Sequence, residues 1–152
     1  MTSTEPSPAN TPAETALAAA LSNDHAVIYG YGIVSAHCQP DVNSLVSFAL
    51  AEHRQRRDQV ISMLSGRSVT APVAAAGYQL PMPVNSPTDA AQLAVQMEKD
   101  TEAAWRAVLE AADSADDRKF AVTALTRSAV LSARWKQTLG NWPITTAFPG
   151  AD

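Results

Sequence analysis

This sequence lacks most of the features that would narrow its function at once. Its 152 residues include a single cysteine, Cys38, so no disulfide can form within the chain. Aromatic residues make up only 6% of the chain, and no apolar run approaches the roughly 20 residues of a membrane span. The net charge is −4, which argues against nucleic-acid binding, because such binding needs a clustered basic surface. We therefore expect no nucleic-acid or membrane partner, and a reducing, cytoplasmic compartment.

Signature motifs of common catalytic sites are missing as well. The chain has no glycine-rich phosphate loop, no nucleophile elbow and no paired-cysteine zinc motif. His37 and Cys38 are adjacent, but neighbouring helical residues point about 100° apart, so the pair is no ready catalytic dyad. The sequence therefore offers no recognised nucleophile and no phosphate-binding site.

Start and stop signals divide the chain into four long helical stretches. Thr11 and Glu14 form a capping box with a proline at the first helical position, where no N–H is needed. Ser86 begins a similar start signal, and Gly66 is a predicted left-handed cap at a helix C-terminus. No segment alternates as a half-buried strand would, so the predicted class is all-α. The predicted helices span residues 12–38, 41–66, 87–113 and 114–140.

The lengths of the connections indicate how these helices are arranged. Links of about two to four residues after the first and third helices force antiparallel neighbours. The link over residues 67–85 can return the chain along a whole helix, because its extended reach of about 60 Å exceeds a helix length of about 37 Å. We predict a four-helix bundle with one long crossover between the second and third helices. An up-down-up-down bundle with one loose connection is the alternative.

The same signals predict the domain organisation. Residues 1–11 are rich in Thr, Ser, Pro and Asn and are expected to form a disordered leader without the basic start of a signal peptide. Residues 12–150 are expected to form one bundle domain, because a chain of this length supports a single core.

Each of the first three helices places ionisable residues on its apolar face. Asp24 and Tyr31 lie two turns apart on the first helix, in line with leucines. His53 and Arg57 fall on the inward line of the second helix, and Glu98 falls on that of the third. Buried charges of this kind need a charged partner or a bound metal ion.

The segments around these residues resemble an uncharacterised family of bacterial ferritin-like domains. The similar segments are Asp24–Gly32, Glu52–Asp58 and Ala147–Gly150, and the resemblance covers about residues 12–150. It implies a ferritin-like four-helix bundle in which Asp24 and Glu98 stand where the superfamily has glutamate ligands. It also implies oxidoreductase or iron-handling chemistry.

The fourth helix does not support an intact metal site. A ferritin-like dinuclear site needs Glu-x-x-His on the second and fourth helices. Glu52 is followed at that spacing by Gln55, and residues 118–139 contain no Asp, Glu or His. We therefore predict a buried arginine–carboxylate network in place of the metal. Its predicted members are Asp24, Tyr31, His53, Arg57, Glu98 and Arg127. A single iron or manganese ion, weakly held by Asp24, His53 and Glu98, is the alternative.

Two functions follow from these alternatives. The first is a non-catalytic structural or interaction module with a degenerate metal site and no cofactor. We expect it to form a homodimer or to bind another protein, because Trp142, Ile144 and Phe148 leave apolar groups in the tail. The second is a metal-binding oxidoreductase or iron-handling protein with a reduced ligand set. A third hypothesis places a small ligand in a cleft beside the long connection. The candidate lining residues of that cleft are Tyr78, Leu80, Met82 and Val84.

Overall fold

The computed structural model describes residues 8–151 and consists of helices and their connections. The long helices are α1 (Pro12–His37), α2 (Asn43–Gly66), α3 (Pro87–Ala111) and α4 (Ala115–Leu139), and a short 3₁₀ helix, η1 (Pro40–Val42), precedes α2. No strand occurs within residues 8–151, so the prediction of an all-helical chain with four long helices is confirmed. Most of the predicted leader, residues 1–7, lies outside the described residues.

The helix ends follow from capping side chains. The Thr11 hydroxyl accepts from the backbone N–H of Glu14, whose carboxylate accepts from the N–H of Thr11 in return. Serine hydroxyls cap α3 and α4 in the same position. Gly140 ends α4 with a left-handed φ of 68°. The predicted left-handed cap at Gly66 is wrong, because Gly66 is the last helical residue of α2 and the positive φ falls at Ser68.

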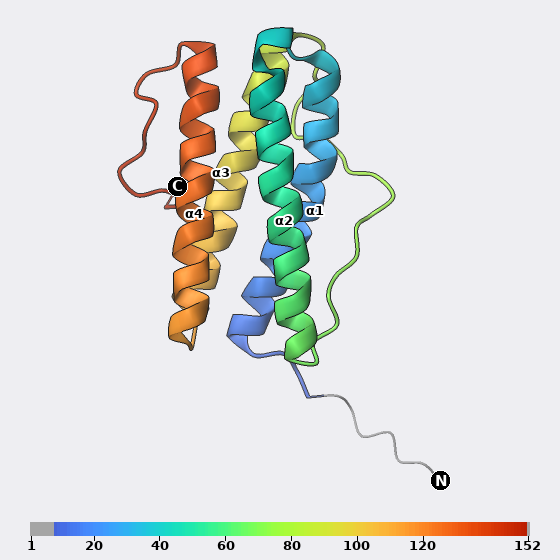
Figure 1. Cartoon of the computed structure of the whole chain (residues 1–152), viewed down its shortest axis with the longest axis vertical. Helices are drawn as coiled ribbons and strands as arrows, with labels where there is room; N and C mark the ends of the chain where they lie inside the picture. The colour runs from blue at the N-terminus through green and yellow to red at the C-terminus, as the bar shows by residue number, and fades with distance from the viewer. Residues whose placement is uncertain (1–7, 152) are drawn as a thin grey trace.

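The four long helices lie side by side (Figure 1). The main contacts join α3 to α4, α1 to α3, and α1 to α2. The connection over residues 67–86, here called the crossover connection, runs along the outside of the helices from one end to the other (Figure 1). As a result α2 and α3 start at the same end and run in the same direction, while α1 and α4 run the opposite way.

Two apolar clusters fill the interior, one toward each end of the helices. One cluster contains Tyr31 and Trp135, and the other contains Leu17 and Trp105. Each long helix contributes residues to both clusters, and buried polar residues lie between these two sets. These residues form the polar layer: Asp24 on α1, His53 and Arg56 on α2, Glu98, Thr101 and Glu102 on α3, and Ser128 on α4. None of the described helices combines the length and apolar character needed to cross a membrane.

The C-terminal segment, residues 140–151, turns back beside α4 (Figure 1). It ends against α3, where a Cβ on Gly150 would lie 2.6 Å from the backbone oxygen of Glu102. Gly150 also has a φ of 78°, so both the close approach and the backbone conformation call for glycine there. The segment leaves Trp142 and Phe148 exposed at 76% and 74%.

Gly140→Ala is expected to lower the free energy of unfolding by about 1 kcal/mol, because a side chain disfavours the left-handed conformation. A Cβ at Gly140 would meet no atom within 4 Å, so the backbone conformation alone sets the cost. Gly66→Ala is the matched control, since that position is equally open but helical, and we expect no loss there. Urea unfolding measures both variants, and equal losses would contradict the helix ends described above.

Candidate functional site

The polar layer centres on three fully buried side chains from three different helices. Asp24 of α1, His53 of α2 and Glu98 of α3 each have an exposed fraction of 0%. Each lies on its helix between the residues of the two apolar clusters, so the packing of the helices brings the three together. The structure therefore places all three residual metal-ligand candidates at one point.

His53 joins the other two residues through both of its ring nitrogens. Its Nδ1 lies 2.8 Å from Oδ1 of Asp24, and its Nε2 lies 3.0 Å from Oε1 of Glu98. Burial alone lowers the pKa of His53, but the Glu98 charge and the hydrogen bonds to both carboxylates outweigh it and raise the pKa from 6.5 to about 9. At neutral pH the ring is therefore an imidazolium that donates one hydrogen bond to each carboxylate.

Tyr31 and Trp135 extend this network toward the apolar cluster. The Tyr31 hydroxyl donates to Oε1 of Glu98 at 2.6 Å, and Nε1 of Trp135 donates to the Tyr31 oxygen at 2.9 Å. Burial, reinforced by the neighbouring Glu98 charge, raises the pKa of Tyr31 well above its usual value. Tyr31 therefore keeps its proton and remains a hydrogen-bond donor to Glu98.

Arg56 supplies the second buried cation of the layer. It is 4% exposed, its Nη1 donates to Oγ of Ser128 at 3.1 Å, and the same nitrogen lies 3.8 Å from Oδ1 of Asp24. The guanidinium also lies 5.9 Å from the ring centre of Trp105, within cation–π distance. The formal charges of Asp24 and Glu98 are thus balanced by His53 and Arg56 without any further ion.

Two predicted members lie outside this network, which corrects the prediction. Arg57 donates from Nε to Oδ1 of its neighbour Asp58, and Arg127 is 56% exposed at its side chain and donates to Glu52. The inward position of α2 falls on Arg56 instead. Both Arg56 and Arg57 lie within one turn of His53, so helical spacing does not separate them. The buried Val60 does not separate them either, because it lies four residues after Arg56 and three after Arg57, and both spacings place residues on one face.

Glu102 also belongs to the layer and was not among its predicted members. It lies one turn beyond Glu98, and burial raises its pKa, although the positive charge of Lys136 partly offsets the shift. Its neighbour Thr101 donates to the backbone oxygen of Met97 and accepts from Asn23 of α1. These contacts tie α1 to α3 beside the three central residues.

The donor set does not fit a ferritin-like dinuclear metal site. Such a site takes carboxylates and histidines from all four helices, but α4 contributes Ser128 to this layer and, next to it, Trp135, which donates to Tyr31. Both nitrogens of His53 are engaged with carboxylates, and the Arg56 cation stands beside Asp24. Within residues 8–151 no group of three or more His, Cys, Asp or Glu side chains is arranged to hold a metal ion.

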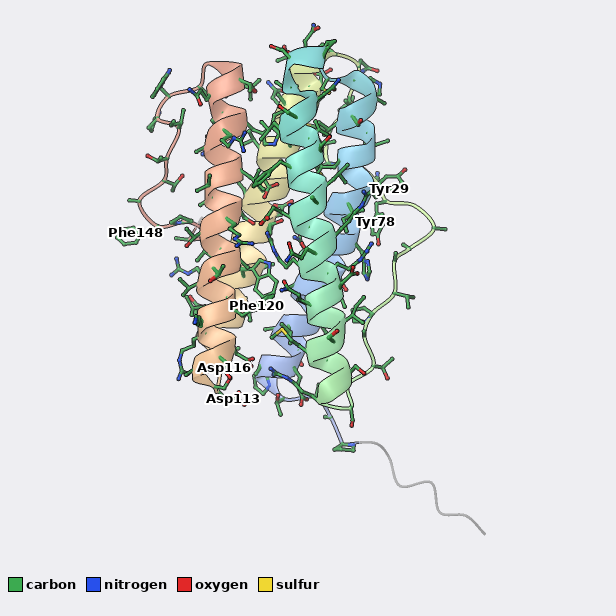
Figure 2. The ribbon with its side chains drawn as sticks, in the orientation of Figure 1. Tyr29, Tyr78, Asp113, Asp116, Phe120 and Phe148 are labelled. Carbon is green, nitrogen blue, oxygen red and sulfur yellow. The ribbon has the colours of Figure 1, made fainter. Side chains whose placement is uncertain are left out.

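Three polar atoms of the layer have no protein partner. They are Oδ2 of Asp24, Oε2 of Glu98 and Nη2 of Arg56. Arg56 also lines a small groove of about 40 Å³ between α2 and α4, where Phe120 projects from α4 toward α2 (Figure 2). A water needs about 10–15 Å³ of such space and two or more polar partners, so this groove can hydrate the guanidinium. The groove therefore offers a place for a water molecule beside Arg56, while Asp24, His53 and Glu98 remain fully buried.

Comparisons with known proteins identify a family and a similar solved structure. The family described as "Domain of unknown function (DUF4439)" matches residues 16–152. The chain is also similar to a solved structure, described as that of a conserved hypothetical protein, rv2844, from Mycobacterium tuberculosis. The two are 64% identical with a TM-score of 0.84, and the match covers 91% of this chain and 97% of that one. No curated protein matches.

The stability of the protein is expected to fall as the pH rises through the pKa of His53. The folded-state pKa lies above the unfolded value, so the stabilisation is complete below about pH 6.5 and is lost by about pH 9. A shift of this size corresponds to about 3 kcal/mol. Urea unfolding across this range measures the loss.

The control for this measurement is a second histidine. His53→Gln should remove the pH dependence between pH 6.5 and 9, whereas His37→Gln should retain it, because His37 lies partly exposed at the end of α1. A wild-type stability that stays constant over the same range would contradict the charged state assigned to His53.

Proposed function

Because this chain belongs to the family of domains of unknown function that its residues 16–152 match, we propose its role from its own buried site. It is a ferritin-like four-helix bundle that acts as a non-catalytic structural or interaction module. Its metal site is degenerate, and no cofactor is needed for its role. The single cysteine, Cys38, is a free thiol, so the proposed compartment is the reducing cytoplasm.

One observation carries this proposal: His53 bridges two buried carboxylates through both of its ring nitrogens. In a metal site, Asp24 and Glu98 would each give an oxygen to the ion, and His53 would give it an unprotonated nitrogen. Here both nitrogens of His53 lie within hydrogen-bond distance of those carboxylates, at 2.8 and 3.0 Å, and the raised pKa of about 9 keeps both protonated at neutral pH. Arg56 lies beside Asp24, so His53 and Arg56 together supply two positive charges, the same charge as a divalent metal ion.

The course of the chain supports the ferritin-like assignment. The crossover connection makes α2 and α3 parallel and α1 antiparallel to both (Figure 1), which is the layout expected of a ferritin-like bundle with one long crossover. The segments around Asp24 and His53 resemble such domains in sequence as well. The chemistry differs at α4, whose residues 118–139 contain no acidic residue and no histidine.

A second candidate function is metal binding, as a ferritin-like oxidoreductase or iron-handling protein with a reduced site. The unpartnered atoms Oδ2 of Asp24 and Oε2 of Glu98 favour it, since each is a free carboxylate oxygen buried in the layer. An iron or manganese ion would have to displace at least one proton from His53 and tolerate the nearby guanidinium of Arg56. We rank this candidate below the structural role for that reason.

The proposed interaction is self-association as a homodimer, with binding of another protein as the alternative. Large apolar side chains remain exposed on α2, on α4 and in the C-terminal segment. They include Phe48, Val130, Trp142 and Phe148. Phe48 and Arg134 are also in cation–π contact across α2 and α4, at 5.4 Å. Together these groups give the α4 side of the molecule the aromatic and arginine content that is enriched at protein interfaces.

Removing the Arg56 cation is expected to make the protein bind a divalent metal ion in the polar layer. Arg56→Gln leaves two buried carboxylates with one cation, which costs about 3–5 kcal/mol when a buried pair is broken. A divalent ion can then compensate, so Mn²⁺ or Zn²⁺ should raise the melting temperature of Arg56→Gln by several degrees. The melting temperature of the wild type should not change.

Two further variants make this test specific. Arg56→Lys keeps the buried cation and should behave as the wild type, and Arg127→Gln removes an exposed arginine of α4 and should show no metal response. Elemental analysis of wild-type protein from metal-replete medium completes the test. About one iron or manganese per chain, lost in Glu98→Gln, would contradict the proposal and establish the second candidate.

Self-association is tested by light scattering on size-exclusion fractions. The wild type is expected to elute with twice the mass of one chain at high protein concentration. The double variant Trp142→Ser, Phe148→Ser should shift toward the monomer, because both side chains are exposed in the C-terminal segment. Val73→Ser is the control, since Val73 is 88% exposed but lies in the crossover connection. A wild type that stays monomeric would contradict the dimer.

A further inference from the structure

A second cavity lies apart from the polar layer, between α1, α3 and the crossover connection. Its volume is about 280 Å³, at the lower end of the roughly 300–1,000 Å³ of small-molecule pockets. Its apolar lining includes Val27 and Gly30 of α1 and Leu93 and Met97 of α3. Leu80 of the crossover connection adds to this surface. The cavity is therefore sized for a compact ligand with an apolar body.

Two tyrosines form one wall of this cavity. Tyr29 of α1 and Tyr78 of the crossover connection have ring centres 5.5 Å apart at an angle of 53°, and Figure 2 shows the two rings together between α1 and the connection. The Tyr78 hydroxyl accepts a hydrogen bond from the backbone N–H of Ala75 at 2.9 Å. The wall is therefore aromatic, and the hydrogen bond from Ala75 holds the Tyr78 ring in place.

A hydrogen bond between His25 of α1 and Pro72 also holds the crossover connection to α1. Nε2 of His25 donates to the backbone oxygen of Pro72 at 3.0 Å. His25 lies one turn before Tyr29 on α1. This contact anchors the chain a few residues before Tyr78, so the cavity is bounded by a connection that is tied to the helices.

The polar groups of the cavity favour a positively charged ligand. Among the described residues that line it, Asp100 is the one with a formal charge, and Asn23 and Gln79 add neutral amides. No lysine, arginine or histidine belongs to that lining. A carboxylate and an aromatic wall in the same cavity are the groups that recognise ammonium ions, through charge attraction and cation–π contact.

We propose that this cavity binds a small organic amine in its cationic form. The ammonium group lies between Asp100 and the rings of Tyr29 and Tyr78, and the apolar body packs on Leu93 and Met97. This binding site shares no charged residue with the polar layer and does not rest on the function proposed above.

Three probes of nearly equal size test the proposal: phenethylamine, which is cationic, phenethyl alcohol, which is neutral, and phenylacetate, which is anionic. Each is titrated into the full chain at low salt and followed by NMR chemical shifts of the backbone amides. The amine is expected to shift the signals of Gly30 and Tyr78 and to bind about fivefold more tightly than the alcohol. Phenylacetate should not bind.

Asp100→Asn is expected to abolish the preference for the amine over the alcohol. This variant should fold, because Asp100 is exposed and its contact with Gln96 needs only an acceptor oxygen. Asp116→Asn is the control, since it removes the same charge at the start of α4, far from the two tyrosines (Figure 2). Equal binding of all three probes, shifts confined to other surfaces, or an unchanged preference in Asp100→Asn would each overturn the proposal.

Discussion

The bridge that His53 makes between Asp24 and Glu98 is the contact on which the rest of the interior depends. It joins α1, α2 and α3 at one buried point, and Tyr31 and Trp135 link that point to α4. Neither carboxylate could remain buried without a cation close by, because desolvation of an unpaired charge outweighs the gain from packing. The two apolar clusters on either side exclude water from this layer and strengthen its hydrogen bonds.

Much of the fold was predictable from local signals. The capping box at Thr11, the serine cap at Ser86 and the glycine stop at Gly140 each act within a few residues, so the sequence alone reveals them. The start of α2 was less clear, because η1 takes up residues 40–42 before the α-helix begins. Gly66 was misread since glycine is also tolerated as a last helical residue. The length of the crossover connection indicated the relation between α2 and α3.

The candidate site was predictable in part, for a physical reason. Asp24, His53 and Glu98 stood out because each interrupts an apolar face, and the structure brings them together. The arginine was assigned to position 57 instead of 56, since residues three and four positions from His53 lie on nearly the same face. Periodicity also could not show that one imidazole would meet two carboxylates, because that depends on how far each helix is shifted along its neighbours.

The most direct measurement of the central claim is the protonation state of the His53 ring, read from its two ¹⁵N signals at neutral pH in ¹⁵N-labelled protein. Both nitrogens are expected to carry protons, because the pKa of His53 is raised to about 9 by the two carboxylates. Signals from an imidazolium that persist to about pH 9 would agree with it. One unprotonated nitrogen at neutral pH, or a nitrogen bound to a metal ion, would contradict it.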